Sequence, residues 1–145
     1  MKNAYNLSIL LVDDNEADGT ITRIAIRSVM PDARIRYFES GADAIAHLQR
    51  IDDPADYPHL MLLDLNMPGV DGIEVLKLLK VNRLKHFPVY MLSGSTILGE
   101  ERLSLRCGAD AFYEKPRDYN DTVALFTRIL PGFLIEQYGP QSLTA

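Results

Sequence analysis

The fold is decided by the stretch Leu60-Met61-Leu62-Leu63-Asp64-Leu65-Asn66-Met67-Pro68-Gly69, where an apolar run leads into one aspartate and then stops at a turn. A short apolar run bounded by turn residues is typical of a strand that is buried on both faces in the middle of a parallel sheet. Open α/β sheets bind ligands beyond the carboxyl ends of their strands. Asp64 therefore stands where chemistry is expected, although a cap of the following loop would also explain an acid here.

Similar apolar runs alternate with helical segments along the rest of the chain. Further strands are expected at residues 8–12, 33–38, 88–92 and 109–113. Helices are expected at residues 16–29, after N-caps at Ser40 and Asp71, and at residues 96–107 and 119–130. Five strands that alternate with five helices predict parallel strands joined by right-handed crossovers, with helices on both faces. The expected fold class is therefore α/β, a doubly wound five-stranded parallel sheet with five helices.

The last two expected helices differ in their apolar pattern, because only the final one shows a regular apolar face, with Val123, Phe126 and Leu130. The segment at residues 96–107 has a poor apolar stripe, so we expect a weakly anchored helix, which Gly108 ends in the left-handed conformation. Pro131 and Gly132 are expected to end the last helix. The sequence accordingly divides into an N-terminal extension (residues 1–7), a domain (residues 8–131) and a C-terminal tail (residues 132–145).

Length and composition indicate one globular domain. The chain has 145 residues, enough for one domain with a core and too few for two ordinary ones. Twenty acidic residues against fifteen lysines and arginines give a net charge of −5 without a basic patch, which argues against direct binding of nucleic acid. The single cysteine, Cys107, excludes an internal disulfide. No stretch resembles a signal peptide or a membrane span, so a cytoplasmic protein without a membrane partner is expected.

Polar residues follow four of the expected strands. They are Asp13 and Asp14 after the first, Asp64 after the third, Ser93 after the fourth and Lys115 after the fifth. Because the carboxyl ends of parallel strands meet at one edge, these side chains should converge. Three acids repel one another unless a cation neutralises them, and Mg²⁺ prefers carboxylate oxygens. One strand-end carboxylate could then attack phosphorus while the metal, the lysine and the hydroxyl hold the phosphoryl oxygens.

Each of these residues also has a simpler interpretation when it is taken alone. Asp13 and Asp14 could cap the first helix, Ser93 could be a turn residue, and Lys115 could be a solvated surface lysine. Their joint occurrence at the ends of four strands favours a functional site. His47, His59 and His86 have no metal-ligand spacing and are expected as surface or loop residues.

At this point the sequence resembles the receiver domain of two-component response regulators, which has a flavodoxin-like fold. Four motifs appear in order, and the resemblance extends from about Ser8 to Leu130. The matching residues are Ile9-Leu10-Leu11-Val12-Asp13-Asp14, then Leu62 to Gly72, then Leu92-Ser93, and finally Gly108 to Phe112 with Lys115-Pro116.

The resemblance implies roles for the polar residues. Asp64 would be the phosphoacceptor, and Asp13, Asp14, Asp64 and the backbone carbonyl of Asn66 would bind Mg²⁺. The signalling protein would catalyse only its own phosphorylation and dephosphorylation, and so would not be a conventional enzyme.

The resemblance also implies a conformational switch. Ser93 would supply the hydroxyl that moves to the phosphoryl group, Phe112 the aromatic side chain that rotates inward with it, and Lys115 the base that pairs with phosphate. Phe112 stands where the family often has tyrosine, so a hydroxyl contact to a partner from this position is not expected. In the family the residue corresponding to Pro116 often follows a cis peptide bond.

The expected function is that of a single-domain response regulator, since only about fifteen residues follow Leu130. A histidine kinase would phosphorylate Asp64, and the protein would signal by phosphorylation-dependent binding to a downstream protein or by phosphorelay. The loop at residues 52–58 and the segment at 84–88 resemble regulators paired with phytochrome-type kinases. The resemblance leaves open a homodimer through the expected fourth helix, fifth strand and last helix.

Three other classes of protein are alternatives. A nucleotide-binding or flavin-binding module of flavodoxin type would need a phosphate cradle after the first strand, where Asp13, Asp14 and Glu16 would repel phosphate. A haloacid-type phosphatase usually carries a second acid where this chain has Asn66. An adaptor that keeps the receiver fold and signals without phosphorylation is the strongest rival.

Overall fold

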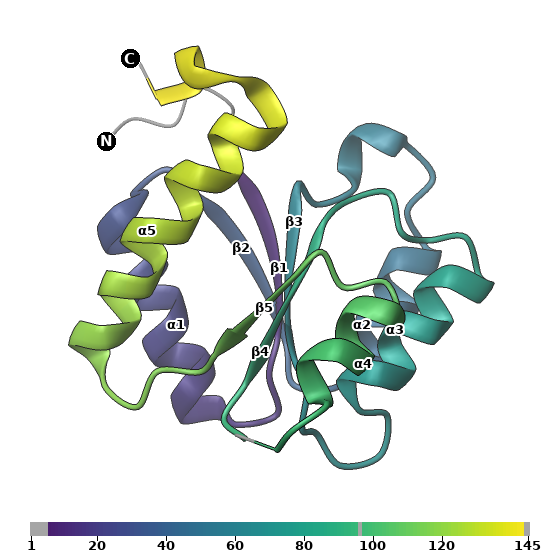
Figure 1. Cartoon of the computed structure of the whole chain (residues 1–145). Coiled ribbons are helices and arrows are strands. Elements are labelled where there is room, and N and C mark those ends of the chain that lie inside the picture. The colour runs from purple at the N-terminus through teal and green to yellow at the C-terminus, as the bar shows by residue number, and fades with distance from the viewer. Residues whose placement is uncertain (1–5, 96, 144–145) are drawn as a thin grey trace.

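In the computed structural model, which describes residues 6–95 and 97–143, one parallel sheet is covered by helices on both faces (Figure 1). The strands are β1 (Ser8–Val12), β2 (Arg34–Phe38), β3 (Leu60–Asp64), β4 (Val89–Ser93) and β5 (Ala111–Glu114). They lie in the order β2-β1-β3-β4-β5, and every neighbouring pair is parallel. The doubly wound α/β fold expected from the sequence is confirmed.

The helices form two layers, one on each side of the sheet (Figure 1). Helices α1 (Glu16–Val29) and α5 (Tyr119–Tyr138) cover one face, and α2 (Gly41–Gln49), α3 (Gly72–Val81) and α4 (Glu100–Arg106) cover the other. Two short 3-10 helices, η1 (Pro54–Asp56) and η2 (Pro140–Leu143), complete the described elements.

The core has two halves because successive side chains of a strand point to opposite faces. Ile9 and Leu11 of β1 pack with α1 and α5, whereas Leu10 and Val12 pack with α2 and α3. Strand β3 is buried at every position, which explains why its sequence is a continuous apolar run rather than an alternating one. The edge strand β2 is half exposed, as expected.

Side-chain caps fix where several helices begin. Ser40 accepts a hydrogen bond from the backbone N–H of Asp43, and Asp71 accepts one from that of Glu74, so both N-caps expected from the sequence are confirmed. Gly108, which follows the end of α4, has a φ of +113°, a region that favours glycine.

Helix α4 is shorter than the expected segment at residues 96–107. It begins at Glu100 after Gly99, whose φ is +93° and which offers no capping side chain. The first expected residue, Thr96, lies outside the described residues. Leu98, Leu103 and Leu105 are exposed, so the expectation of a weakly anchored helix is confirmed.

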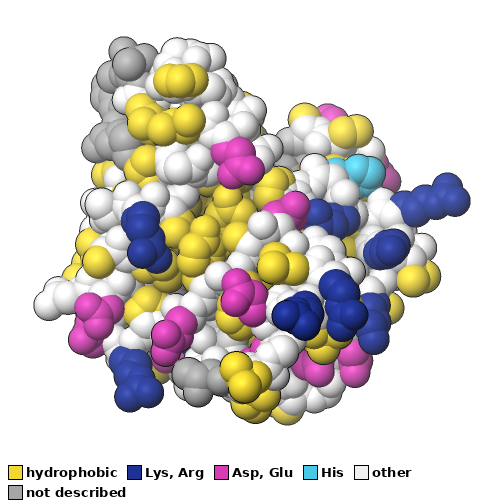
Figure 2. Space-filling model, viewed as in Figure 1, with side chains coloured by type: hydrophobic (Ala, Val, Ile, Leu, Met, Phe, Trp, Pro, Cys, Tyr) yellow, Lys and Arg dark blue, Asp and Glu magenta, His cyan; other side chains and the backbone are white. Residues whose placement is uncertain are grey.

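Hydrophobic side chains also gather on another part of the surface. Figure 2 shows them on the face where α5 flanks β5.

The expected end of the last helix at Leu130 is wrong. Helix α5 continues through Pro131 and Gly132 to Tyr138, where Gly139 donates its N–H to the carbonyl of Ile135. A proline weakens a helix interior because it has no N–H to donate. Here the extension buries Phe133 and Leu134 in the core, each 1% exposed, which offsets that loss. The residues assigned to a tail therefore belong to the packed structure as far as Leu143; the domain boundaries themselves stay a prediction.

Two further features of the described residues are the geometry of the peptide bonds and the character of the helices. The peptide bond before Pro116 is trans, in contrast to the cis bond frequent in the family, and no cis bond occurs within residues 6–95 and 97–143. Over the same ranges, the helices are too short or too polar to cross a membrane.

His59 lies in the loop before β3, as expected, but it also holds the start of β1. Its Nδ1 accepts a hydrogen bond of 2.9 Å from the backbone N–H of Ser8, and its ring meets Tyr138 edge-on. Burial, together with the charge of Arg34, lowers the pKa of His59 below its usual value of 6.5. A protonated imidazole has no acceptor nitrogen, so protonation at Nδ1 would remove the bond to Ser8.

The first prediction tests the extension of α5. Phe133→Ala should lower the free energy of unfolding by about 3–5 kcal/mol, because it leaves a cavity in the core. Ile135→Ala is the matched control. Ile135 is 40% exposed, so this substitution should lower the free energy of unfolding much less. Urea unfolding followed by circular dichroism measures both. Equal small losses would show that the end of α5 contributes nothing to the core.

The second prediction concerns pH. Because the pKa of His59 is lowered by folding, its contribution is complete above its usual pKa of 6.5 and is lost as the pH falls through the folded value. Between about pH 7.5 and about pH 5, the wild type should therefore lose more unfolding free energy than His59→Gln. His86→Gln, at an exposed position, is the control and should lose as much unfolding free energy over this pH range as the wild type does. The idea fails if His59→Gln and the wild type share the same pH dependence.

Candidate functional site

Three carboxylates meet at the carboxyl edge of the sheet. Asp13 and Asp14 follow β1, Asp64 ends the neighbouring strand β3, and one oxygen atom of each lies within 4.8 Å of the others. Asp13 is 1% exposed and Asp64 is 5% exposed, whereas Asp14 is exposed to solvent. The structure thus brings together the three acids that the sequence placed at one edge.

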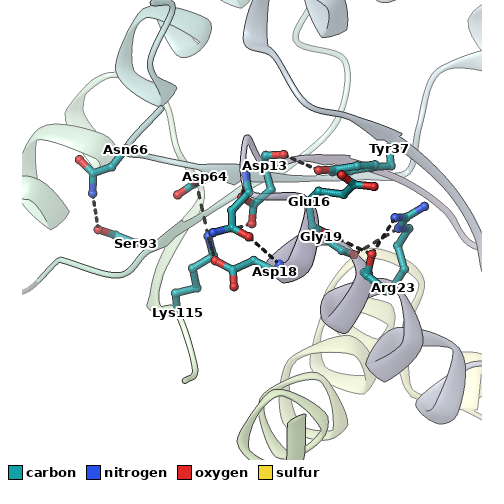
Figure 3. A network of polar contacts seen from close by, with 12 residues as sticks. Asp13, Glu16, Asp18, Gly19, Arg23, Tyr37, Asp64, Asn66, Ser93 and Lys115 are labelled. Atoms are coloured by element: carbon teal, nitrogen blue, oxygen red, sulfur yellow. Dashed lines mark hydrogen bonds and ion pairs between the residues drawn. The ribbon is translucent and has the colours of Figure 1, made fainter. Parts of the chain in front are cut away.

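Lys115, which follows β5, reaches into this cluster (Figure 3). Its Nζ lies 2.8 Å from Oδ2 of Asp13, 3.0 Å from Oδ2 of Asp18 and 3.6 Å from Oδ2 of Asp64. Burial disfavours the charged amine, but the hydrogen bond to Asp13 and the charge of Asp64 outweigh it and raise the pKa of Lys115 above its usual value. The lysine is therefore a fixed positive charge among the carboxylates.

One ammonium does not neutralise all of these acids. Burial raises the pKa of the Asp64 carboxyl to about 7; Lys115 opposes this effect, and Asp13 and Asp14 add to it. A group that is costly to ionise in this way gains from a nearby cation. Carboxylate oxygens are ligands for a hard divalent cation such as Mg²⁺, so Asp13, Asp14 and Asp64 fit the metal that the sequence predicted.

The hydroxyl of Ser93 lies at the end of β4 and is fully buried. It accepts a hydrogen bond of 3.3 Å from Nδ2 of Asn66 (Figure 3). It accepts a second one of 3.1 Å from the backbone N–H of Ser95. It donates its proton to Oε2 of Glu100 in α4, at 3.2 Å. The backbone beside it is also fixed, because the N–H of Lys115 donates to the carbonyl of Ser93.

Phe112 lies in β5, where it is paired with Met91 of β4. Its side chain is partly buried against the half of the core that α2 and α3 cover. The structure therefore puts Phe112 on the strand next to Ser93, on the side of the sheet where α4 lies. Its role as a rotating aromatic residue stays a prediction, as does the role of the Asn66 carbonyl.

Sequence reasoning missed two acidic residues of the site. Asp18 in α1 pairs with Lys115, and Glu100 in α4 accepts the proton of Ser93. Both lie in the first turn of a helix, where acids are common because they complement the helix dipole. The sequence therefore gave no signal that separates them from ordinary first-turn acids.

Tyr37 is a third residue that the sequence did not indicate. Its hydroxyl donates a 2.7 Å hydrogen bond to the backbone carbonyl of Asp13, and the guanidinium of Arg23 lies 4.4 Å above its ring (Figure 3). A Cβ atom on Gly19 would approach the Tyr37 ring to 2.7 Å. Gly19 in α1 thus leaves the space that lets Tyr37 reach the backbone of Asp13.

Most of the chain matches a known family, the response regulator receiver domain, over residues 9–127. Response regulator Rcp1 of Synechocystis sp. is 33% identical over 116 residues, which cover 78% of this chain and 79% of that protein. Hybrid signal transduction histidine kinase M of Dictyostelium discoideum is 30% identical over 126 residues, which cover 84% of this chain but 5% of that protein.

Many solved structures share the fold, and two of them are response regulators of similar length. The phosphorylated cyanobacterial phytochrome response regulator RcpA has a TM-score of 0.77 at 29% identity, over 88% of this chain and 94% of that one. The Mn²⁺-bound form of response regulator Rcp1 has a TM-score of 0.72 at 30% identity, over 95% of this chain and 97% of that one. One of these proteins is phosphorylated and the other holds a divalent cation.

The third prediction tests the contact between Gly19 and Tyr37. Gly19→Ala should lower the free energy of unfolding by about 1–3 kcal/mol, because the new methyl group overlaps the Tyr37 ring. Gly132→Ala is the matched control in another helix, where nothing lies within 4 Å of a Cβ atom. It should raise the free energy of unfolding by about 0.5–1 kcal/mol. Urea unfolding compares the two, and stabilisation of both variants would refute the close approach.

Proposed function

Because this chain belongs to the response regulator receiver domain family and resembles the phytochrome-associated regulators Rcp1 and RcpA, we propose that Asp64 accepts a phosphoryl group from a histidine kinase. The observation that carries this proposal is the position of the Asp64 carboxylate. It is buried at the end of β3, beside Asp13 and Asp14 and 3.6 Å from Lys115.

The transfer is a substitution at phosphorus. An oxygen of Asp64 forms a bond to phosphorus while the bond from phosphorus to the donor imidazole nitrogen breaks, and the electron pair of that bond stays on the nitrogen. A donor histidine that is protonated at its other nitrogen then leaves as neutral imidazole. The ionised form of Asp64 is the nucleophile, and Lys115 favours that form.

The residues around Asp64 hold the transferred group. Lys115 reaches both Asp13 and Asp64, so its ammonium can pair with a phosphoryl oxygen after only a small displacement. The Ser93 hydroxyl can donate to a second phosphoryl oxygen once it turns toward Asp64. Mg²⁺, held by Asp13, Asp14, Asp64 and the backbone carbonyl of Asn66, would neutralise charge on the phosphoryl oxygens.

The output of this reaction is proposed to be a change at α4. Movement of Ser93, together with rotation of Phe112, would reposition this short helix, which has exposed leucines and no side-chain N-cap. The face formed by α4, β5 and α5, part of which carries exposed hydrophobic side chains in Figure 2, would then bind a downstream protein, a phosphotransfer partner or a second copy of the chain. The resemblance to Rcp1 and RcpA supports a phytochrome-type kinase as the donor and hence a cytoplasmic site of action.

The fourth prediction tests the phosphoacceptor. After incubation with Mg²⁺ and acetyl phosphate, the intact mass of the wild type should increase by one phosphoryl group, and Asp64→Asn should show no increase. Asp52→Asn, an equal change of charge in an exposed loop, should be labelled like the wild type. Removal of Mg²⁺ with a chelator should abolish labelling, because the three carboxylates then repel the incoming phosphate.

Labelling of Asp64→Asn at the wild-type level would rule out Asp64 as the acceptor. No labelling of the wild type, under conditions in which a control receiver is labelled, would favour an adaptor that signals without phosphorylation. Labelling in the presence of chelator would remove the metal from the proposal while leaving the acceptor in place.

A further inference from the structure

The hydroxyl of Ser93 makes three hydrogen bonds, and its proton goes to α4. The oxygen accepts from Nδ2 of Asn66 and from the N–H of Ser95, and the proton is donated to Oε2 of Glu100. A serine hydroxyl has one proton and two lone pairs, so these three bonds use its full capacity. Ser93 therefore cannot donate to a phosphoryl group on Asp64 while it donates to Glu100.

We infer that Glu100 is a positioning residue that holds the Ser93 hydroxyl in the unphosphorylated protein and competes with the phosphoryl group for its proton. This inference rests on the proposed function of Asp64. The first turn of α4 would then take part in the switch directly, through the hydrogen bond from Oγ of Ser93 to Oε2 of Glu100.

The contact between Ser93 and Glu100 is long for a hydroxyl bonded to a carboxylate, at 3.2 Å, so it can be exchanged for a shorter one. Ser93 is fully buried and Glu100 is half-buried, and a hydrogen bond to an ionised acceptor is stronger than one between neutral groups. A phosphoryl group is also an anionic acceptor, so it can take the proton of Ser93 in a shorter bond. The two anions repel each other, which favours departure of Glu100 when the phosphoryl group arrives.

The loss of this contact has a consequence for α4 because little else secures its first turn. Gly99 precedes the helix without a capping side chain, and Ser104 is the only fully buried residue within the helix. Ser104 donates its hydroxyl proton to the carbonyl of Glu100, a bond that stays inside the helix. Release of the Glu100 carboxylate therefore frees the start of α4 from the end of β4.

Binding of a phosphoryl mimic tests the competition without the chemistry of transfer. With Mg²⁺ present, titration with beryllium fluoride followed by fluorine NMR should show about tenfold tighter binding to Glu100→Gln than to the wild type, because a charged competitor of the mimic is lost. Glu101→Gln is the matched control, since it removes the same charge from the same helical turn at an exposed residue. It should bind beryllium fluoride like the wild type.

A double-mutant cycle assigns the effect to Ser93. In a Ser93→Ala background, Glu100→Gln should no longer change the affinity for beryllium fluoride, since no hydroxyl remains to be contested. An undiminished effect in that background would overturn the inference. Equal tightening by Glu100→Gln and Glu101→Gln would also overturn it, because the cause would then be the overall charge of α4.

A second readout separates this inference from the proposed function. In the unphosphorylated protein without beryllium fluoride, Glu100→Gln should speed hydrogen exchange at the Leu103 amide, which closes the first turn onto Gly99, and Glu101→Gln should not. Unchanged exchange would show that Glu100 does not hold the start of α4. If exchange is faster but the protein binds no beryllium fluoride and accepts no phosphoryl group, the contact between Ser93 and Glu100 exists. It then has no part in a phosphorylation switch, and the proposed function is wrong.

Discussion

The structure depends on the placement of several carboxylates around one ammonium at the carboxyl edge of a buried parallel sheet. Asp13 and Asp64 are almost inaccessible to solvent, and Lys115 contacts both of them as well as Asp18. Burial of acids in this way is costly unless opposite charge is close. The sheet supplies the rigidity that keeps these groups together, because β1 and β3 are central strands with apolar neighbours on both faces.

The two helical layers are coupled to this edge with different strength. On one side, Tyr37 ties the backbone of Asp13 to β2 and packs over Gly19 of α1, so this part of the site is held by hydrogen bonding and by close packing. On the other side, α4 is connected to β4 through a hydrogen bond between Ser93 and Glu100. The weaker hold on this side fits the proposed transmission of a change at Asp64 to α4.

The opposite end of the sheet is covered by apolar side chains from both ends of the described part of the chain. The end of α5 covers it with Phe133 and Leu134, and η2 packs beneath the same half of the core, to which Leu7 and Leu143 also contribute. His59 links the loop before β3 to the start of β1 there. This end of the molecule is therefore organised for stability, while the carboxyl edge carries the proposed chemistry.

The sequence by itself determined the fold class, most element positions and the acids Asp13, Asp14 and Asp64, because strand periodicity and strand ends are local signals. Only the tertiary structure decided that α5 continues through Pro131, since the burial of Phe133 and Leu134 outweighs a local helix-breaking preference. It also decided that Asp18 and Glu100 belong to the site, because first-turn acids look alike in sequence until the sheet brings Lys115 and Ser93 against them.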